Sequence, residues 1–294
     1  MRGRCTAAVL AAGCLWGFMG LFRRLLEDLG ASSASSIVLR CGIAALCFAL
    51  TLALTGPSQF KLRLRDLWCF LGSGLLSLLF FTYCYFEAMG RMSLSAAAIL
   101  LYTAPAIVTL LSAPLFGERL SGVKLAAVGL AFAGCALVSG LGGEMELTLS
   151  GVLFGLGSGV GYALYSIFAR FALERGYSSN TINFYSCLLA AVGAALIWGA
   201  REPVELLTAS RESALLCLAT GVVSCYLPYL LYTYGLTGLE TGRASVMASV
   251  ETVVATLVGV VFFHEGLTAS AAAGAALVLA AVALLNARTR RRTH

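Results

Sequence analysis

The chain is dominated by long apolar runs that are separated by short polar links. A helix of about 20 apolar residues crosses the hydrocarbon core of a bilayer, which is roughly 30 Å thick. The alternation of apolar and polar positions that marks barrel strands is absent, so helices must satisfy the backbone polar groups in lipid. The pattern predicts an all-α membrane protein with ten transmembrane helices, at about residues 6–23, 36–55, 66–87, 94–115, 122–140, 150–170, 181–199, 212–234, 243–262 and 269–287.

Two segments, residues 97–120 and 244–267, share one pattern of apolar run, aromatic pair, Glu and Leu. They are 147 positions apart in a chain of 294 residues, and weaker matches at an offset of 146 extend the similarity to the first spans. Internal duplication of this kind is typical of secondary transporters. Five spans per copy is an odd number, so the second copy must enter the membrane in the opposite orientation. The sequence therefore predicts two inverted five-helix repeats, residues 1–142 and 143–294, with a polar boundary at residues 140–150.

The composition agrees with a membrane protein and limits its partners. Hydrophobic residues make up 60% of the chain and charged residues 12%, which is more apolar surface than a soluble domain can bury. Fourteen of the 20 Lys and Arg residues lie on the side that holds both termini, which predicts cytoplasmic N- and C-termini in a plasma (inner) membrane. The basic C-terminal tail is an ordinary topology signal, so binding of nucleic acid is not predicted.

The cysteines, the glycines and the N-terminus add no further chemistry. Ten cysteines fall mostly within apolar spans and form no C-x-x-C motif, so we expect no disulfide scaffold, no metal site and no cofactor. Five glycines in residues 151–161 follow small-x-x-x-small spacing, which predicts close helix packing and not a phosphate loop. Residues 2–14 faintly resemble a lipoprotein signal, but the apolar run continues through Phe22, which favours a retained first helix.

Glu251 is the principal candidate functional residue. It lies eight residues past Arg243 at the start of the ninth span, which places it about 12 Å into the bilayer and close to the midplane. Ionisable side chains at this depth are costly and are functional candidates by default. We expect Glu251 to bind a cationic group of the substrate or to couple transport to protons. A hydrogen bond that only joins two helices is the structural alternative.

Further polar residues are candidates for gating. Arg40 and Glu87 lie near the outer face and could form an ion pair that opens and closes, or could extend separately to the interface. Asn183 enters the seventh span from the cytoplasmic side and could act as a gate or as a helix cap. Glu118 and Glu265 close equivalent helices, and we expect both to be helix-end residues.

Aromatic side chains form a second group of candidates for the substrate cavity. Their hydroxyl groups and ring faces could contact a cationic, zwitterionic or aromatic substrate, whereas interfacial belts are the structural alternative. Pro105 and Pro228 are expected to break or kink the fourth and eighth spans beside them. The candidates are Trp16, Tyr83, Tyr102, Tyr162, Tyr165, Tyr226 and Tyr229.

Several short motifs together resemble the drug/metabolite transporter superfamily, and within it the EamA family. The motifs are Leu15-Trp16-Gly17, Arg40, residues 88–97 (AMGRMSLSAA), Pro105 and residues 115–120 (LFGERL), in the order of the ten-span duplicated plan. The resemblance implies an exporter or exchanger of small metabolites, amino acids or amphipathic drugs, and it does not fix the substrate. Thr252 and His264 depart from the family, which often has proline and glycine at these positions. The first departure predicts a straighter ninth helix.

The sequence thus predicts a secondary transporter that works by alternating access. Expected substrates are amino acids or related small zwitterionic or amphipathic compounds, and organic cations or drugs are the alternative. No ATP-binding loop is present, so ion or solute gradients must supply the energy, with protons as the candidate coupling ion.

A passive channel or membrane scaffold is the alternative from another class of protein. An enzyme is not predicted, because Glu251 has no carboxylate partner in its span and the only histidines are His264 and His294. The expected partners are a small-molecule substrate and the lipid bilayer, in a monomer or a homodimer.

Overall fold

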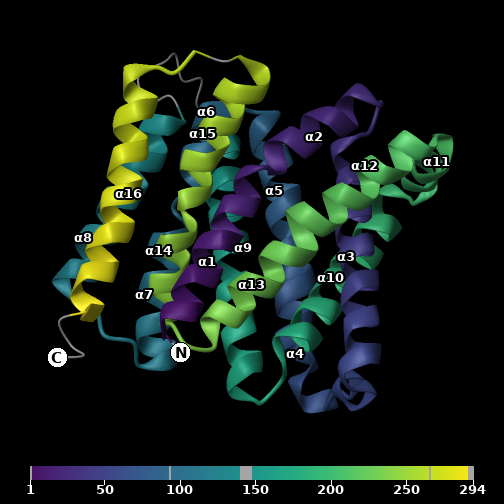
Figure 1. Cartoon of the computed structure of the whole chain (residues 1–294), viewed down its shortest axis with the longest axis horizontal. Coiled ribbons are helices and arrows are strands. Elements are labelled where there is room, and N and C mark those ends of the chain that lie inside the picture. Colours follow the sequence, from purple (N-terminus) through teal and green to yellow (C-terminus); the bar gives the residue numbers. More distant parts are fainter. Residues whose placement is uncertain (1, 93, 140–147, 265, 291–294) are drawn as a thin grey trace.

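The computed structural model describes residues 2–92, 94–139, 148–264 and 266–290, and every regular element in these ranges is a helix. Figure 1 shows a single bundle with α8 and α16 at one edge and α3 and α10 toward the other. The α-helices are α1 (Arg2–Gly17), α2 (Met19–Asp28), α3 (Ser33–Thr55), α4 (Leu67–Leu71), α5 (Phe80–Met89), α6 (Leu94–Leu101), α7 (Ala104–Phe116), α8 (Gly122–Val138), α9 (Leu149–Glu174), α10 (Ser179–Trp198), α11 (Arg201–Ala209), α12 (Arg211–Gly221), α13 (Leu227–Leu236), α14 (Thr241–Ala248), α15 (Val250–Phe263) and α16 (Ala269–Arg290). Short 3₁₀ turns are η1 (Pro57–Phe60) and η2 (Leu64–Asp66), and π-helical segments are η3 (Gly72–Leu79) and η4 (Val222–Tyr226).

The helices are long and apolar enough for a multi-pass membrane protein. Within the described ranges, nine continuous helical segments meet the length and hydropathy needed to cross a bilayer, and α8 is a further apolar helix of 17 residues. The predicted all-α membrane class is therefore confirmed. The predicted boundary at residues 140–150 lies largely outside the described residues.

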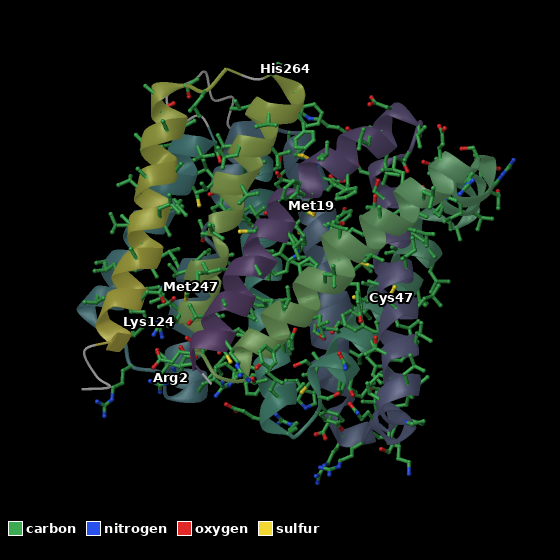
Figure 2. All side chains as sticks on the ribbon, in the orientation of Figure 1. Arg2, Met19, Cys47, Lys124, Met247 and His264 are labelled. Atoms are coloured by element: carbon green, nitrogen blue, oxygen red, sulfur yellow. The ribbon has the colours of Figure 1, made fainter. Side chains whose placement is uncertain are left out.

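The two ends of the bundle differ in the segments that they carry. The start of α1 and the end of α16 lie at the same end, which we call the terminal face (Figure 1). The terminal face also includes the links at residues 117–121 and 237–240. The opposite face carries α2, α11 and the end of α15, and Figure 2 shows His264 there and Arg2 at the terminal face.

Helix irregularities occur at matching positions of the two halves. The fourth span is broken between α6 and α7 at residues 102–103, and the ninth is broken between α14 and α15 at Ser249, 147 positions later. The π-helical segments η3 and η4 also overlap at this offset, and such segments are frequent at functional sites. The expected straighter ninth helix is wrong. The Thr252 hydroxyl donates to the Ser249 carbonyl (2.9 Å), so a polar side chain can satisfy the break without a proline.

Close glycine contacts hold α1 and α9 against these breaks. A Cβ atom on Gly13 of α1 would lie 2.8 Å from the Ala248 carbonyl oxygen, beside the break in the ninth span. A Cβ atom on Gly159 of α9 would lie 2.8 Å from the Leu100 carbonyl oxygen, beside the break in the fourth. The close packing predicted for the glycines of residues 151–161 is confirmed. Because a glycine at each contact lets the neighbouring helix approach the break closely, the adjoining residues are fixed around the centre of the bundle.

Candidate functional site

A cavity of about 220 Å³ lies in the centre of the bundle and extends toward the opposite face. Its deep part is lined by Glu251 of α15 and Tyr229 of α13, whereas Arg23 of α2 and Ser33 of α3 line it near the opposite face. Helices from both halves of the chain therefore build one site. Within the described residues, no group of His, Cys, Asp and Glu has the arrangement of a metal site.

Glu251 is in the first turn of α15, directly after the break at Ser249. The Tyr162 hydroxyl of α9 donates a hydrogen bond to Glu251 Oε2 at 3.3 Å. Tyr102, at the break between α6 and α7, lines the same cavity. The two helix breaks thus place a carboxyl group and a phenol at one site. A carboxylate with a phenolic donor can hold a proton or a cationic group.

Arg40 of α3 contributes a positive charge to the same cavity. Its Nη1 approaches the Met19 sulfur at 2.8 Å, and Figure 2 shows Met19 toward the opposite face of the bundle. Its Nε is buried and has no hydrogen-bond partner among the described residues. Leaving a buried donor without a hydrogen bond costs about 1–3 kcal/mol of folding free energy, so a buried guanidinium donor without an acceptor is unusual.

The predicted ion pair between Arg40 and Glu87 is not formed in the structure. Glu87 is paired with Arg91, one helical turn further along the chain, and does not line the cavity. Arg91 lies in the turn that directly follows α5, four residues after Glu87, so Glu87 has a local partner within reach. Arg40 is therefore left as a cavity residue without Glu87.

Most of the predicted aromatic residues converge on the centre. Trp16 packs edge-on against Tyr229 with ring centroids 5.3 Å apart, and Tyr229 packs edge-on against Tyr165 at 4.7 Å. Tyr162 and Tyr102 line the cavity beside them. Tyr165 does not line the main cavity. It lines a smaller adjoining space, together with Glu251.

Two predicted aromatic residues lie elsewhere. Tyr83 is 44% exposed on the outside of α5, where its ring packs against Phe154. The Tyr226 hydroxyl is 2.8 Å from Thr51 Oγ1, and its ring packs against Phe48. Neither residue lines the cavity, because neighbouring helix positions point in different directions and the π-helical segment η4 alters this direction locally.

Sequence reasoning did not select several polar or aromatic residues of the main cavity, among them Tyr85, Thr82 and Ser224. Tyr232, which belongs with the aromatic candidates of the second half of the chain, lines the smaller adjoining space. Tyr85 and Tyr232 occupy equivalent positions at the offset of 147. That equivalence was a signal for a shared role, but proximity to a span end favoured an interfacial interpretation of Tyr85.

Asn183 is buried in α10 and connects three helices. Its Oδ1 accepts hydrogen bonds from the Tyr165 hydroxyl of α9 and the Thr233 hydroxyl of α13, and its Nδ2 donates to the Tyr229 carbonyl at 3.1 Å. The cap of α10 is Ser178, so the interpretation of Asn183 as a helix cap is wrong. A buried amide that is hydrogen-bonded to two neighbouring helices fixes the relative positions of the helices that it joins.

The terminal face is closed by a buried ion pair near the N-terminus of α14. Lys124 Nζ lies 2.6 Å from Glu118 Oε2 and 3.2 Å from Glu240 Oε2. Glu118 also accepts hydrogen bonds from the backbone N–H groups of Thr241 and Gly242. The expectation that Glu118 is a helix-end residue is thus confirmed in a stronger form, because it caps a second helix. Glu265 lies outside the described residues.

This closure predicts a specific dependence of stability on pH. Burial raises the pKa of the Glu118 carboxyl, but the hydrogen bond and charge of Lys124, with the backbone N–H of Thr241, outweigh it and lower the pKa overall. A pKa that is lower in the folded state stabilises the fold above the unfolded value of about 4.3, and this stabilisation is lost as the pH falls through the folded value. We expect Glu118→Gln to be less stable than wild type at pH 7 by about 1–3 kcal/mol.

Thermal unfolding of purified protein checks this expectation. The difference in stability between wild type and Glu118→Gln should shrink as the pH falls below about 4.3. Glu205→Gln is the matched control, because Glu205 forms an exposed pair with Arg201 within α11. A difference that stays constant from pH 7 to acid conditions would contradict the assignment.

A helical membrane bundle with a central cavity that is closed at one face has the architecture of a membrane transporter. The chain belongs to the EamA-like transporter family, whose model matches residues 4–140 and 149–287. It is 35% identical to an uncharacterized transporter of Archaeoglobus fulgidus over 198 residues, which cover 67% of this chain and 69% of that protein. It is 26% identical to the uncharacterized transporter YvbV of Bacillus subtilis (strain 168), over 86% of this chain and 83% of that protein. A crystal structure with 21% identity has the same fold, with a TM-score of 0.83 and complete coverage of both chains.

Proposed function

We propose that this transporter is a secondary carrier that exports or exchanges amino acids or related small zwitterionic compounds by alternating access. In this proposal ten helices cross the plasma (inner) membrane as two inverted five-helix repeats, residues 1–142 and 143–294. The terminal face is cytoplasmic, because the distribution of Lys and Arg favours this orientation. The central cavity is then open toward the outside and closed toward the cytoplasm.

The observation that carries the choice of substrate is the presence of Arg40 and Glu251 in one cavity. An α-amino acid carries a carboxylate and an ammonium group, which match a guanidinium and a carboxylate respectively. The guanidinium group of Arg40 lines the cavity and can donate to the substrate carboxylate. The rings of Trp16, Tyr162 and Tyr229 line the same cavity and can contact an apolar or aromatic side chain of the substrate.

The closed terminal face supports a carrier over a passive channel. Lys124 and Glu118 lie in a buried pair there, and Gly242 of α14 packs directly against Thr109 of α7. A continuous pore would have to pass through this contact. In the proposed cycle, the contact opens when the cavity closes at the opposite face, which is the exchange of access expected for inverted repeats.

Glu251 has two alternative roles in this proposal. Its carboxyl group can bind the substrate ammonium or carry a proton during the return step, with Tyr162 as the hydrogen-bond donor in either case.

Export of organic cations is the second candidate function, since Glu251 and the tyrosine rings suit a cation. Arg40 in the same cavity disfavours this second candidate. Its positive charge repels a cation that has no carboxylate to accept a hydrogen bond from the guanidinium group.

Counterflow in proteoliposomes tests the proposed function. Liposomes loaded with one unlabelled amino acid should transiently accumulate the same labelled amino acid, and a panel of amino acids identifies the best substrate. Arg40→Gln should lower the rate by about tenfold or more, because it removes a charged hydrogen bond to the substrate. Arg201→Gln, an exposed change at the opposite face, should keep the wild-type rate.

The contradictory results are equally specific. Linear flux without counterflow would favour a channel. Accumulation of amines but of no amino acid, with Arg40→Gln as active as wild type, would favour the cation exporter.

A further inference from the structure

A second cavity, of about 210 Å³, lies at the terminal face, apart from the proposed transport site. Basic side chains reach it from three parts of the chain: Arg2 at the start of α1, Arg119 and Lys124 around the start of α8, and Arg243 in the first turn of α14. Leu285 of α16 supplies an apolar wall. Figure 2 places Arg2 and Lys124 at this end of the bundle.

Positive charge in this cavity exceeds negative charge. Lys124 is paired with Glu118 and with Glu240, so these three residues already interact with one another. Within the described ranges, Arg2 and Arg119 form no ion pair. The arginines and Lys124 therefore retain positive charge that the two carboxylates do not balance, and an anion would be attracted to the cavity.

Arg243 is held in the wall of the cavity by a neighbouring helix. Its Nη2 donates to Asn286 Oδ1 at 3.1 Å, which fixes the guanidinium against α16. Its Nε is buried and has no hydrogen-bond partner among the described residues. Arg243 as a whole is only partly buried and lines the cavity, so the rest of its guanidinium group can donate to a ligand that carries acceptor oxygens.

Topology alone does not explain this arrangement. The positive-inside rule requires only that basic residues lie near one membrane surface. It does not require residues from α1, α8 and α14 to converge on one cavity, nor does it require Asn286 of α16 to hold one of their guanidinium groups there. Binding of an anion accounts for this convergence.

We propose that this cavity binds a phosphate group, with Arg2, Arg119 and Arg243 as its ligands. The planar guanidinium fork matches phosphate oxygens and can donate two hydrogen bonds to them. The cavity lies where α8 and α16 reach the terminal face, and Leu125 of α8 is 46% exposed nearby in the chain. The phosphate of an anionic lipid headgroup and a free phosphate ion present the same chemistry here.

Thermal unfolding of the full chain in neutral detergent tests the proposal, because a ligand that binds the folded state raises its stability. Three probes are titrated at constant ionic strength: short-chain phosphatidylglycerol, phosphatidylcholine of the same chain length, and inorganic phosphate. The test variant is Arg2→Gln/Arg119→Gln, whose two side chains are exposed and therefore not required for folding. The control is Arg201→Gln/Arg211→Gln, which removes the same charge from exposed positions of α11 and α12.

We expect phosphatidylglycerol to raise the unfolding temperature of wild type and of the control more than phosphatidylcholine does. The concentration needed for half of this shift should rise about tenfold or more in the test variant. A similar effect of inorganic phosphate would identify a site that also takes free phosphate, whereas no effect of inorganic phosphate would identify a headgroup site. The proposal is overturned if phosphatidylglycerol and inorganic phosphate both leave wild type unchanged, if the two lipids act equally while inorganic phosphate has no effect, or if the test and control variants lose the shift equally.

Discussion

Glu251→Gln is expected to lower the rate of counterflow by about 10- to 100-fold and to leave the fold intact. The amide keeps the shape of the side chain and can still accept the hydrogen bond from Tyr162. It cannot bind a proton reversibly, and it offers no negative charge to a substrate ammonium. A hydrogen bond to a charged group contributes about 1.5–3 kcal/mol, which corresponds to this range of rates.

The measurement is the initial rate of counterflow in proteoliposomes at several pH values. Glu205→Gln is the control, because Glu205 is exposed and pairs with Arg201 in its own helix. If Glu251 carries protons, the rate of the variant should also lose the pH dependence of wild type. A variant with the rate and pH profile of wild type would restrict Glu251 to a structural hydrogen bond.

Gly134→Leu is expected to destabilise the bundle severely at the contact between α8 and α16. A Cβ atom on Gly134 would lie 2.6 Å from the Gly274 carbonyl oxygen and 2.9 Å from the Val278 nitrogen. These neighbours are backbone atoms, so they cannot rotate away as a side chain could. Overpacking of this kind costs about 3 kcal/mol or more, because the two helices must separate.

Gly129→Leu provides a matched control on the same helix. No heavy atom lies within 4 Å of a Cβ atom built on Gly129, which is exposed on α8. This variant should keep the wild-type unfolding temperature or exceed it slightly, since leucine has a higher helix propensity than glycine. Equal unfolding temperatures of the two variants in detergent would mean that α8 and α16 do not pack as the structure has them.

The helical plan was predictable because its signals are strong and local. Apolar runs of the length of a bilayer predict spanning helices, and the glycine spacing in residues 151–161 predicted close contacts that the structure contains. Glu251 could also be singled out, because a carboxyl group deep in an apolar run is rare. Its place in the central cavity agrees with that selection.

The details that the sequence could not supply depend on contacts between distant segments. Tyr83 and Tyr85 are two positions apart, yet one is exposed outside the bundle and the other lines the cavity. Their depth in the span is similar, so only the rotation of α5 separates them. The break at Ser249 was missed for a similar reason: it coincides with the packing of Gly13 against Ala248, which is far away in the chain.

The sequence also does not decide whether a polar side chain pairs with a local or a distant residue. Glu87 and Arg40 lie near the same face, but Glu87 pairs with Arg91 in the turn that follows its own helix. Asn183 has the position of a possible cap in the sequence, whereas in the structure its side chain is used by α9 and α13. In both cases burial and the rotation of the helix decide the partner. Neither property can be read from the spacing of residues along the sequence.

The central claim is that Arg40 and Glu251 bind the two charges of one zwitterionic substrate. It is tested most directly by inhibition of counterflow with three matched compounds: the best amino acid, the amine that lacks its carboxylate, and the acid that lacks its ammonium group. Wild type should be inhibited most strongly by the amino acid. Arg40→Gln should reduce its advantage over the amine, and Glu251→Gln should reduce its advantage over the acid. Equal inhibition of wild type by all three compounds, or variants that leave both preferences unchanged, would contradict the claim.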